Sequence, residues 1–139
     1  MDLAGARKVY IPINHEVGGR GLHWSLCVAD MEKKRVIHYD SFKNRTTTIQ
    51  ERILDFLEDD DDWKEGNMSS FEPNDWEIVQ DSGPTPEQKN GKDCGVFTCQ
   101  FIAFLNENIG ENFDFKQEQE DMVHMRWRMM YSILYGEIV

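Results

Sequence analysis

The sequence lacks long hydrophobic runs and has few cysteines. No apolar stretch approaches the length that spans a bilayer, and the N-terminus MDLAGARKVY lacks the hydrophobic core of a signal peptide. Cys27, Cys94 and Cys99 form an odd set without the spacing of a disulfide framework, which favours free thiols in a reducing compartment. We therefore expect an intracellular protein with no membrane partner.

Basic residues are also in short supply. The chain has 26 acidic against 15 basic residues and a formal net charge of -11, which would repel a phosphate backbone and argues against a nucleic-acid partner. Its length of 139 residues and its apolar fraction of 40% are enough for one core. We expect one folded domain over residues 1–139, present as a monomer.

Short apolar runs predict strands over residues 8–13 (KVYIPI), 22–28 (LHWSLCV), 35–40 (RVIHYD) and 75–80 (DWEIVQ). The polar stretch DMEKK between the second and third runs has the right length for a hairpin loop. The Gly- and Pro-containing stretch DSGPTPEQKNGKD after the fourth run predicts a loop. The acidic run EDDDD is expected to be solvated.

Helical spacing of apolar residues appears in three places. In TTTIQERILDFLED it predicts a helix with Thr48 and Glu51 as a capping box. From Cys94 to about Asn108 the apolar residues cover more than one face, as in a buried helix. A third helix is predicted over roughly 117 to 135, with these residues at core spacing: Val123, Trp127, Met130 and Leu134.

Cys94 lies where the polar loop becomes the second helix. A lone cysteine in an apolar setting is most often a buried core residue. However, Asp93 or Asn90 can cap the helix, and the free N–H groups of the first turn would stabilise a thiolate there. Both interpretations stay open at this point, whereas Cys99 in mid-helix and Cys27 in mid-strand are expected in the core.

His23 and Asp40 are a candidate base and its partner. If the strands 22–28 and 35–40 pair as an antiparallel hairpin, these two residues fall across from each other or diagonally on one face. The carboxylate can then hold the imidazole tautomer that faces a cysteine. A cross-strand pair of this kind is, by itself, more often structural.

The other three histidines are assigned no catalytic role. His38 is expected one residue off the face of the candidate pair, and His15 and His124 in solvent or core positions. A metal site formed by Cys94, Cys99 and a histidine is a weak alternative, because the spacing matches no common zinc motif. No metal is expected.

Gln88 is a candidate oxyanion donor. The backbone N–H of Cys94 would supply one donor, and the Gln88 amide, six residues upstream on a loop, could supply another. A loop glutamine is ordinarily polar surface. The ordered combination HW, YDS and Q-x5-CG is far more specific than any of its parts.

With these motifs the sequence resembles the catalytic domain of the ubiquitin-like-protein-specific cysteine proteases, the SUMO (sentrin)-specific protease family. The match runs from VYIPIN through HWSLCV, RVIHYDS and PEQKNGKDCGVFTC to MRWRMMYSIL. The resemblance implies an α+β, papain-like fold in which a central mixed sheet packs on a buried helix that begins at Cys94. It also implies a location in the nucleus, the cytoplasm or both.

Carried over by residue, the resemblance implies that His23 is the general base, Asp40 its orienting partner, Cys94 the nucleophile and Gln88 the oxyanion donor. Trp24, otherwise a core aromatic, matches the residue that confines the Gly-Gly tail of the substrate. The implied function is a thiol isopeptidase or endopeptidase that cleaves after the C-terminal Gly-Gly of a ubiquitin-like modifier, most directly SUMO. No cofactor is implied.

Other functions stay open: a protease for another ubiquitin-like modifier, an acyltransferase with a similar triad, or a modifier-binding protein with little or no catalysis. The family's domain has a substantial portion before the VYIPIN strand, including a second tryptophan over the modifier's tail, whereas only MDLAGARK precedes it here. We therefore expect an N-terminally short domain that reacts slowly with full-length modifier.

Overall fold

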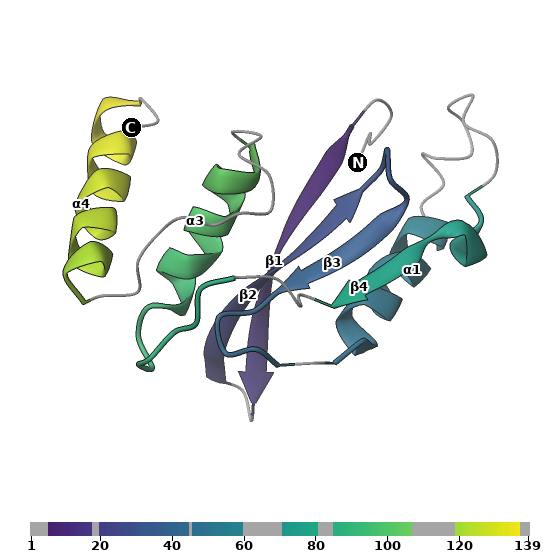
Figure 1. Ribbon diagram of the computed structural model, residues 1–139, viewed down its shortest axis with the longest axis horizontal. Helices are drawn as coiled ribbons and strands as arrows, with labels where there is room; N and C mark the ends of the chain where they lie inside the picture. The colour runs from purple at the N-terminus through teal and green to yellow at the C-terminus, as the bar shows by residue number, and fades with distance from the viewer. Residues whose placement is uncertain are drawn as a thin grey trace.

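The computed structural model of the protein (Figure 1) describes residues 6–17, 20–44, 46–59, 71–80, 85–106 and 119–136. The elements in chain order are β1 (Lys8–Val17), β2 (Arg20–Asp30), β3 (Arg35–Tyr39), α1 (Thr48–Asp59), the short 3-10 helix η1 (Pro73–Asp75), β4 (Glu77–Gln80), α3 (Cys94–Asn106) and α4 (Gln119–Tyr135). Figure 1 shows α1 on one side of the sheet and α3 on the other, with α4 outside α3.

The four strands form one mixed sheet in the order β1-β2-β3-β4. β2 pairs antiparallel with β1 and with β3, whereas β3 and β4 are parallel. This arrangement confirms the predicted hairpin, whose register pairs Leu26 with Tyr39 and Asp30 with Arg35. The fourth predicted strand is shorter than expected, because Asp75 belongs to η1 and Trp76 is the C-cap of η1.

β1 is longer than its apolar run. The strand continues through polar residues to Val17, and its register pairs His15 with His23 before a bulge at Glu16. The prediction of a strand over 8–13 therefore ended too early. Pairing with β2 gives the backbone of this polar stretch hydrogen-bond partners, which a hydrophobic pattern does not reveal.

The central strand β2 is buried on both faces. Its residues alternate between two clusters: Leu26 and Val28 contact the α3 side, while Cys27 and Ala29 contact the α1 side. The sequence of a strand that is covered on both faces is a continuous apolar run. This explains the stretch LCVA at residues 26–29 of β2. The core is therefore a sheet between two helical layers.

α3 begins at Cys94, as predicted, and packs on β2. The helix carries apolar side chains on several faces. The buried ones are Cys94, Val96, Phe97, Phe101 and Leu105. Since the sheet lies on one side of α3 and α4 on the other, a helix that is apolar on several faces is stable here.

The start of α1 differs from the predicted capping box. The helix already includes Thr48, and the hydroxyl of Thr47 donates to Oε1 of Glu51 at 2.8 Å. The hydroxyl oxygen of Thr46 accepts from the amide of Thr48 at 3.3 Å. The prediction was wrong by one residue because three consecutive threonines offer the same capping chemistry.

The predicted core face of α4 is wrong. The four residues expected in the core are exposed: Val123, Trp127, Met130 and Leu134. Met122 and Met125 are buried instead and contact the cluster around α3. Apolar residues lie on both faces of this helix, so helical spacing alone could not select the face that packs.

Parts of four predicted segments lie outside the described residues: 60–62 of the acidic run, 81–84 of the loop, and the helix ends at 107–108 and 117–118. Within the described chain, no helix has both the length and the apolar character required to cross a membrane.

Candidate active site

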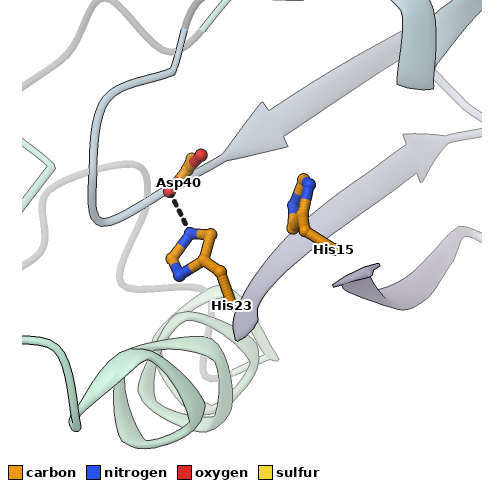
Figure 2. A group of neighbouring side chains, drawn as sticks. All are labelled: His15, His23 and Asp40. Atoms are coloured by element: carbon orange, nitrogen blue, oxygen red, sulfur yellow. Dashed lines mark hydrogen bonds and ion pairs between the residues drawn. The ribbon is translucent and has the colours of Figure 1, made fainter. Parts of the chain in front are cut away.

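His23 and Asp40 meet at one end of the sheet (Figure 2). Nε2 of His23 lies 2.6 Å from Oδ1 of Asp40, and the two side chains are 10% and 2% exposed. Asp40 directly follows β3, and extending the β2–β3 register by one pair places it opposite Ser25 and diagonal to His23. The predicted pairing is confirmed.

The turn after β3 fixes the Asp40 carboxylate. Its Oδ1 also accepts from the amide of Phe42 at 2.8 Å, and its Oδ2 accepts from Nδ2 of Asn44 at 2.8 Å. Burial alone would raise the pKa of Asp40, but the hydrogen bonds from Phe42, His23 and Asn44 outweigh it and hold the pKa below its ordinary value. Asp40 is therefore an ionised acceptor for the imidazole.

The other ring nitrogen of His23 points away from Asp40. Nδ1 is buried and has no hydrogen-bond partner among the described residues. The ring of Phe42 lies against that of His23, with centroids 4.5 Å apart and an interplanar angle of 32°. Figure 2 shows a pale green helix, the colour of α3 in Figure 1, beyond this free nitrogen.

Cys94 is the first residue of α3 and is 9% exposed. The carbonyl of Asp93 accepts from the amide of Phe97 at 3.0 Å, as expected for an N-cap residue. The prediction that the Asp93 side chain caps the helix is wrong. This carboxylate instead accepts from Arg126 Nη2 at 2.5 Å and from Asn90 Nδ2 at 2.7 Å. This carboxylate ties the start of α3 to α4.

Those contacts keep Asp93 ionised. Burial raises its pKa, and the hydrogen bonds from Arg126 and Asn90 outweigh that effect, so the pKa lies below its ordinary value. Oδ1 of Asn90 accepts from the amides of Lys92 and Asp93 at 2.9 and 3.2 Å, which corrects the expectation that it caps α3. The loop before Cys94 is thus held by its own side chains.

Gln88 is buried, with 5% of its surface exposed, although it lies on a loop. Its side-chain Oε1 accepts from the hydroxyl of Ser41 at 2.9 Å, and its Nε2 donates to the carbonyl of Asn90. Its backbone amide donates to the carbonyl of Ser41 at 2.8 Å. The alternative interpretation, in which Gln88 is an ordinary polar residue on the surface, is therefore wrong. Gln88 connects the turn after Asp40 to the loop before Cys94.

Behind His23 lies a hydrogen-bonded group of His15, Ser25 and His38. The hydroxyl of Ser25 lies 2.6 Å from Nε2 of His15 and 2.8 Å from Nε2 of His38. The His15 and His23 rings are 5.2 Å apart. Burial lowers the pKa of His15, electrostatic interaction with the neighbouring His23 adds to that shift, and the Asp40 carboxylate opposes it.

The expectation that His38 lies off the His23 face was wrong. His38 pairs with Cys27, which lies four residues from His23 on the same strand, and side chains alternate with a period of two. His38 therefore points to the same side as His23. His124 is exposed on α4, in keeping with the solvent position expected for it.

Among the described residues, one group has metal-ligand chemistry within reach: the ligand atoms of His15, His23 and Asp40 all lie within 4.8 Å of one another. Nε2 of His15 and of His23 already bonds Ser25 and Asp40. Hydrogen bonding therefore accounts for this arrangement. The alternative set of Cys94, Cys99 and a histidine is not brought together within the described chain.

All three thiols are free. Cys27 is fully buried, as predicted, and burial raises its pKa to about 12. The core prediction for Cys99 is wrong: the residue is exposed, although partial burial of its thiol raises its pKa. Trp24 is 43% exposed beside His23, so it is not the core aromatic that its residue type suggested.

The YDS motif contains Ser41 but gave it no role, and sequence patterns did not identify Phe42 and Asn44 as part of the site. All three follow Asp40 in the chain, so the adjacency was the available signal. Arg126 was also missed, because its link to Asp93 spans 33 positions. Contacts of this kind depend on how the turn and α4 fold back onto the loop.

A family model described as the Ulp1 protease family, C-terminal catalytic domain, matches residues 1–137. A sentrin-specific protease of Caenorhabditis elegans is 33% identical over 139 residues, covering 100% of this chain and 18% of that protein. The ubiquitin-like-specific protease ESD4 of Arabidopsis thaliana is 30% identical over 126 residues, covering 91% of this chain and 23% of that protein.

Solved structures share the fold. The SUMO protease Ulp1 with its catalytic cysteine oxidised to a sulfonic acid has a TM-score of 0.71 at 23% identity, over 100% of this chain and 58% of that one. The C-terminal Ulp1 protease domain in complex with Smt3, the yeast orthologue of SUMO, has a TM-score of 0.71 at 24% identity, over 100% and 57%. These likenesses confirm the predicted α+β, papain-like fold.

The chain thus spans about a fifth of the length of these curated relatives, 18% and 23%, and over half of the solved protease chains, 58% and 57%. The family model, in contrast, covers almost all of its 139 residues. The chain belongs to the Ulp1 protease family, in which it matches the C-terminal catalytic domain.

Proposed function

We propose that this domain is a thiol protease that cleaves after the C-terminal glycine of a ubiquitin-like modifier, most directly SUMO. The observation that carries this proposal is the His23–Asp40 bond of 2.6 Å, which leaves the buried Nδ1 of His23 without a partner on the side away from the carboxylate. Membership of the Ulp1 family and the names of its sentrin- and ubiquitin-like-specific relatives support the substrate class.

Cys94 would be the nucleophile and His23 the base. The Sγ atom of Cys94 attacks the glycine carbonyl and forms a C–S bond, and the proton of the thiol passes to Nδ1 of His23. His23 then returns this proton to the leaving amine as the C–N bond breaks. A water molecule, deprotonated by His23, hydrolyses the thioester and regenerates the thiol with release of the modifier carboxylate.

Two amide donors would stabilise the oxyanion of the tetrahedral intermediate: the backbone N–H of Cys94 and the side chain of Gln88. The start of α3 also favours negative charge near Cys94, because its first N–H groups are not used within the helix. Trp24, exposed beside His23, would line the channel for the glycine tail. A side chain in place of either glycine would collide there.

A panel of modifier probes tests this function. Each probe carries SUMO, ubiquitin or another ubiquitin-like modifier with an electrophile at its C-terminus. We expect a covalent adduct with the SUMO probe, mapped to Cys94 by mass spectrometry and absent in Cys94→Ala. An adduct only with ubiquitin would change the modifier. Binding of SUMO with neither an adduct nor turnover would support a binding protein instead.

A further inference from the structure

The turn that follows β3 contacts both halves of the proposed catalytic machinery. Asp40 holds His23, and the next residue, Ser41, holds Gln88. The carbonyl of Asp40 accepts from the amide of Lys43 at 2.9 Å, and Lys43 has a left-handed φ of 58°. The turn is therefore closed by its own backbone, and it presents two adjacent side chains in fixed directions.

Ser41 binds Gln88 through two hydrogen bonds: the hydroxyl donates to Oε1 at 2.9 Å, and the carbonyl accepts from the backbone amide at 2.8 Å. Ser41 is 1% exposed and Gln88 is 5% exposed, so water does not compete for these groups. A buried amide oxygen without this donor would carry the cost of a missing hydrogen bond.

The same bonds decide which end of the Gln88 amide faces the loop before Cys94. A glutamine side chain has one oxygen acceptor and two N–H donors. The oxygen is bound by Ser41, and one N–H donates to the carbonyl of Asn90. One N–H therefore remains for a ligand. With the amide reversed, its NH2 group would face the Ser41 hydroxyl and its oxygen would face the Asn90 carbonyl.

We propose that Ser41 is a positioning residue that holds the Gln88 amide with one N–H group directed to the oxyanion. This inference rests on the proposed function, in which Gln88 donates to the tetrahedral intermediate. Ser41 itself touches no reacting atom. Its contribution is preorganisation, because a donor that is already oriented needs no rearrangement when charge develops on the carbonyl oxygen.

A double-mutant cycle tests this coupling. Ser41→Ala, Gln88→Ala and the double variant are compared with the parent in kcat and KM on a SUMO–aminomethylcoumarin substrate. We expect Gln88→Ala to lower kcat by about 10²–10³-fold and Ser41→Ala by roughly tenfold, the equivalent of one hydrogen bond. KM should stay nearly constant. Ser41→Ala should cause no further loss when Gln88 is already alanine.

Alkylation by iodoacetamide separates positioning from structural damage. This reaction displaces iodide directly and forms no oxyanion. Cys94 of the Ser41→Ala variant should therefore be alkylated at the parent rate, although the turnover of this variant is reduced. Ser41→Thr, which keeps the hydroxyl, should retain most of kcat. Ser132→Ala on α4 is the matched serine control and should behave as the parent.

The outcomes are distinguishable. An additive loss in the double variant, or equal losses in turnover and alkylation for Ser41→Ala, would overturn the positioning role and leave the protease assignment intact. An unchanged kcat in Gln88→Ala would remove the oxyanion role of Gln88 and with it this inference. Turnover that persists in Cys94→Ala would reject the proposed function itself.

Discussion

Nε2 of His23 lies 2.6 Å from Oδ1 of Asp40, and this bond determines which ring nitrogen is available for chemistry. Since Nε2 is bound by the carboxylate, a proton taken up during the reaction goes to Nδ1, which is buried and without a partner among the described residues. The orientation of the imidazole therefore depends on Asp40 and on the turn that holds it.

Asp40→Ala is expected to lower kcat by about 10²-fold or more, because it removes the acceptor that orients His23. Asp40→Asn should lose less activity, since its amide oxygen can still accept from both His23 and Phe42. Its NH2 group would face Asn44, which must turn its own amide to accept. Steady-state kinetics on a SUMO–aminomethylcoumarin substrate measures both variants. If Asp40→Ala kept a third of the parent kcat, the orienting role would be wrong.

Thiol mapping should give the order Cys94, then Cys99, then Cys27. Cys94 has the helix start and the proposed imidazole partner, Cys99 is exposed but has a raised pKa, and Cys27 is fully buried with a pKa of about 12. Timed iodoacetamide labelling of the folded protein near neutral pH, read by mass spectrometry, tests the order. The comparison in Cys94→Ser shows how much signal the other two contribute. Faster labelling of Cys99 would contradict an activated Cys94.

Much of the fold followed from pattern and spacing. The hairpin register could be predicted because a short polar loop joins two apolar runs, and α3 because its apolar residues begin directly after a polar loop. The packed face of α4 could not be predicted, since Met125 and Trp127 are both large apolar residues but only Met125 reaches the core. Which face packs depends on the position of α3.

The site, like the fold, has contacts that could be predicted from the sequence and contacts that could not. His23, Asp40 and Cys94 lie at the ends of predicted elements, so element geometry placed two of them together and the third at a helix start. The contacts of Ser41 with Gln88 and of His15 with Ser25 join segments that are 47 and 10 positions apart. They depend on a tight turn and on a strand extension that no hydrophobic pattern indicated.

His15 is expected to make stability fall as the pH drops. Its pKa in the folded state lies below the ordinary value, chiefly because of burial and then because of electrostatic interaction with His23. Below pH of about 6.5 the unfolded chain therefore binds more protons at this position, and the free energy of unfolding decreases. His15→Phe keeps a ring beside His23 and Ser25 and should flatten this slope in urea unfolding between pH 7 and pH 5.

His124→Phe is the matched control, because His124 is exposed on α4, whereas His15 lies against Ser25 and His23. We expect the His15 variant to change the slope. A parallel shift of stability at every pH, with the slope unchanged, would show that the His15 ring contributes packing or its bond to Ser25 but no proton linkage.

Arg126→Gln should destabilise the domain by about 1 kcal/mol near neutral pH, a value reduced from that of a buried charged hydrogen bond because the Arg126 side chain is 50% exposed. The loss arises because the buried Asp93 carboxylate keeps only Asn90. The pKa of Asp93 is lowered in the folded state, so this stabilisation is present above its unfolded pKa and disappears as pH falls. Urea unfolding at pH 7 and at pH 3 measures the difference.

Arg52→Gln on α1, where the side chain is exposed, provides the control for loss of a charge. It should change stability less than Arg126→Gln at pH 7. If both variants lost the same amount, or if the loss in Arg126→Gln were equal at pH 7 and pH 3, the ion pair with Asp93 would not be its source.

Trp24 offers a test of the substrate tail. The residue is 43% exposed although its neighbour His23 is buried, so a large apolar surface faces solvent directly beside the proposed base. Removing that surface should weaken binding of the Gly-Gly tail and misplace the scissile carbonyl. Trp24→Ala is therefore expected to raise KM and to lower kcat on a modifier substrate, since tail contacts both bind and position. Trp24→Phe should retain much of both. Trp127, on α4, is 63% exposed, and Trp127→Ala serves as the control, with parent kinetics expected. Iodoacetamide, which carries no tail, should alkylate Cys94 at the same rate in all of these variants. Slower alkylation in Trp24→Ala would mean that Trp24 supports His23 rather than the substrate.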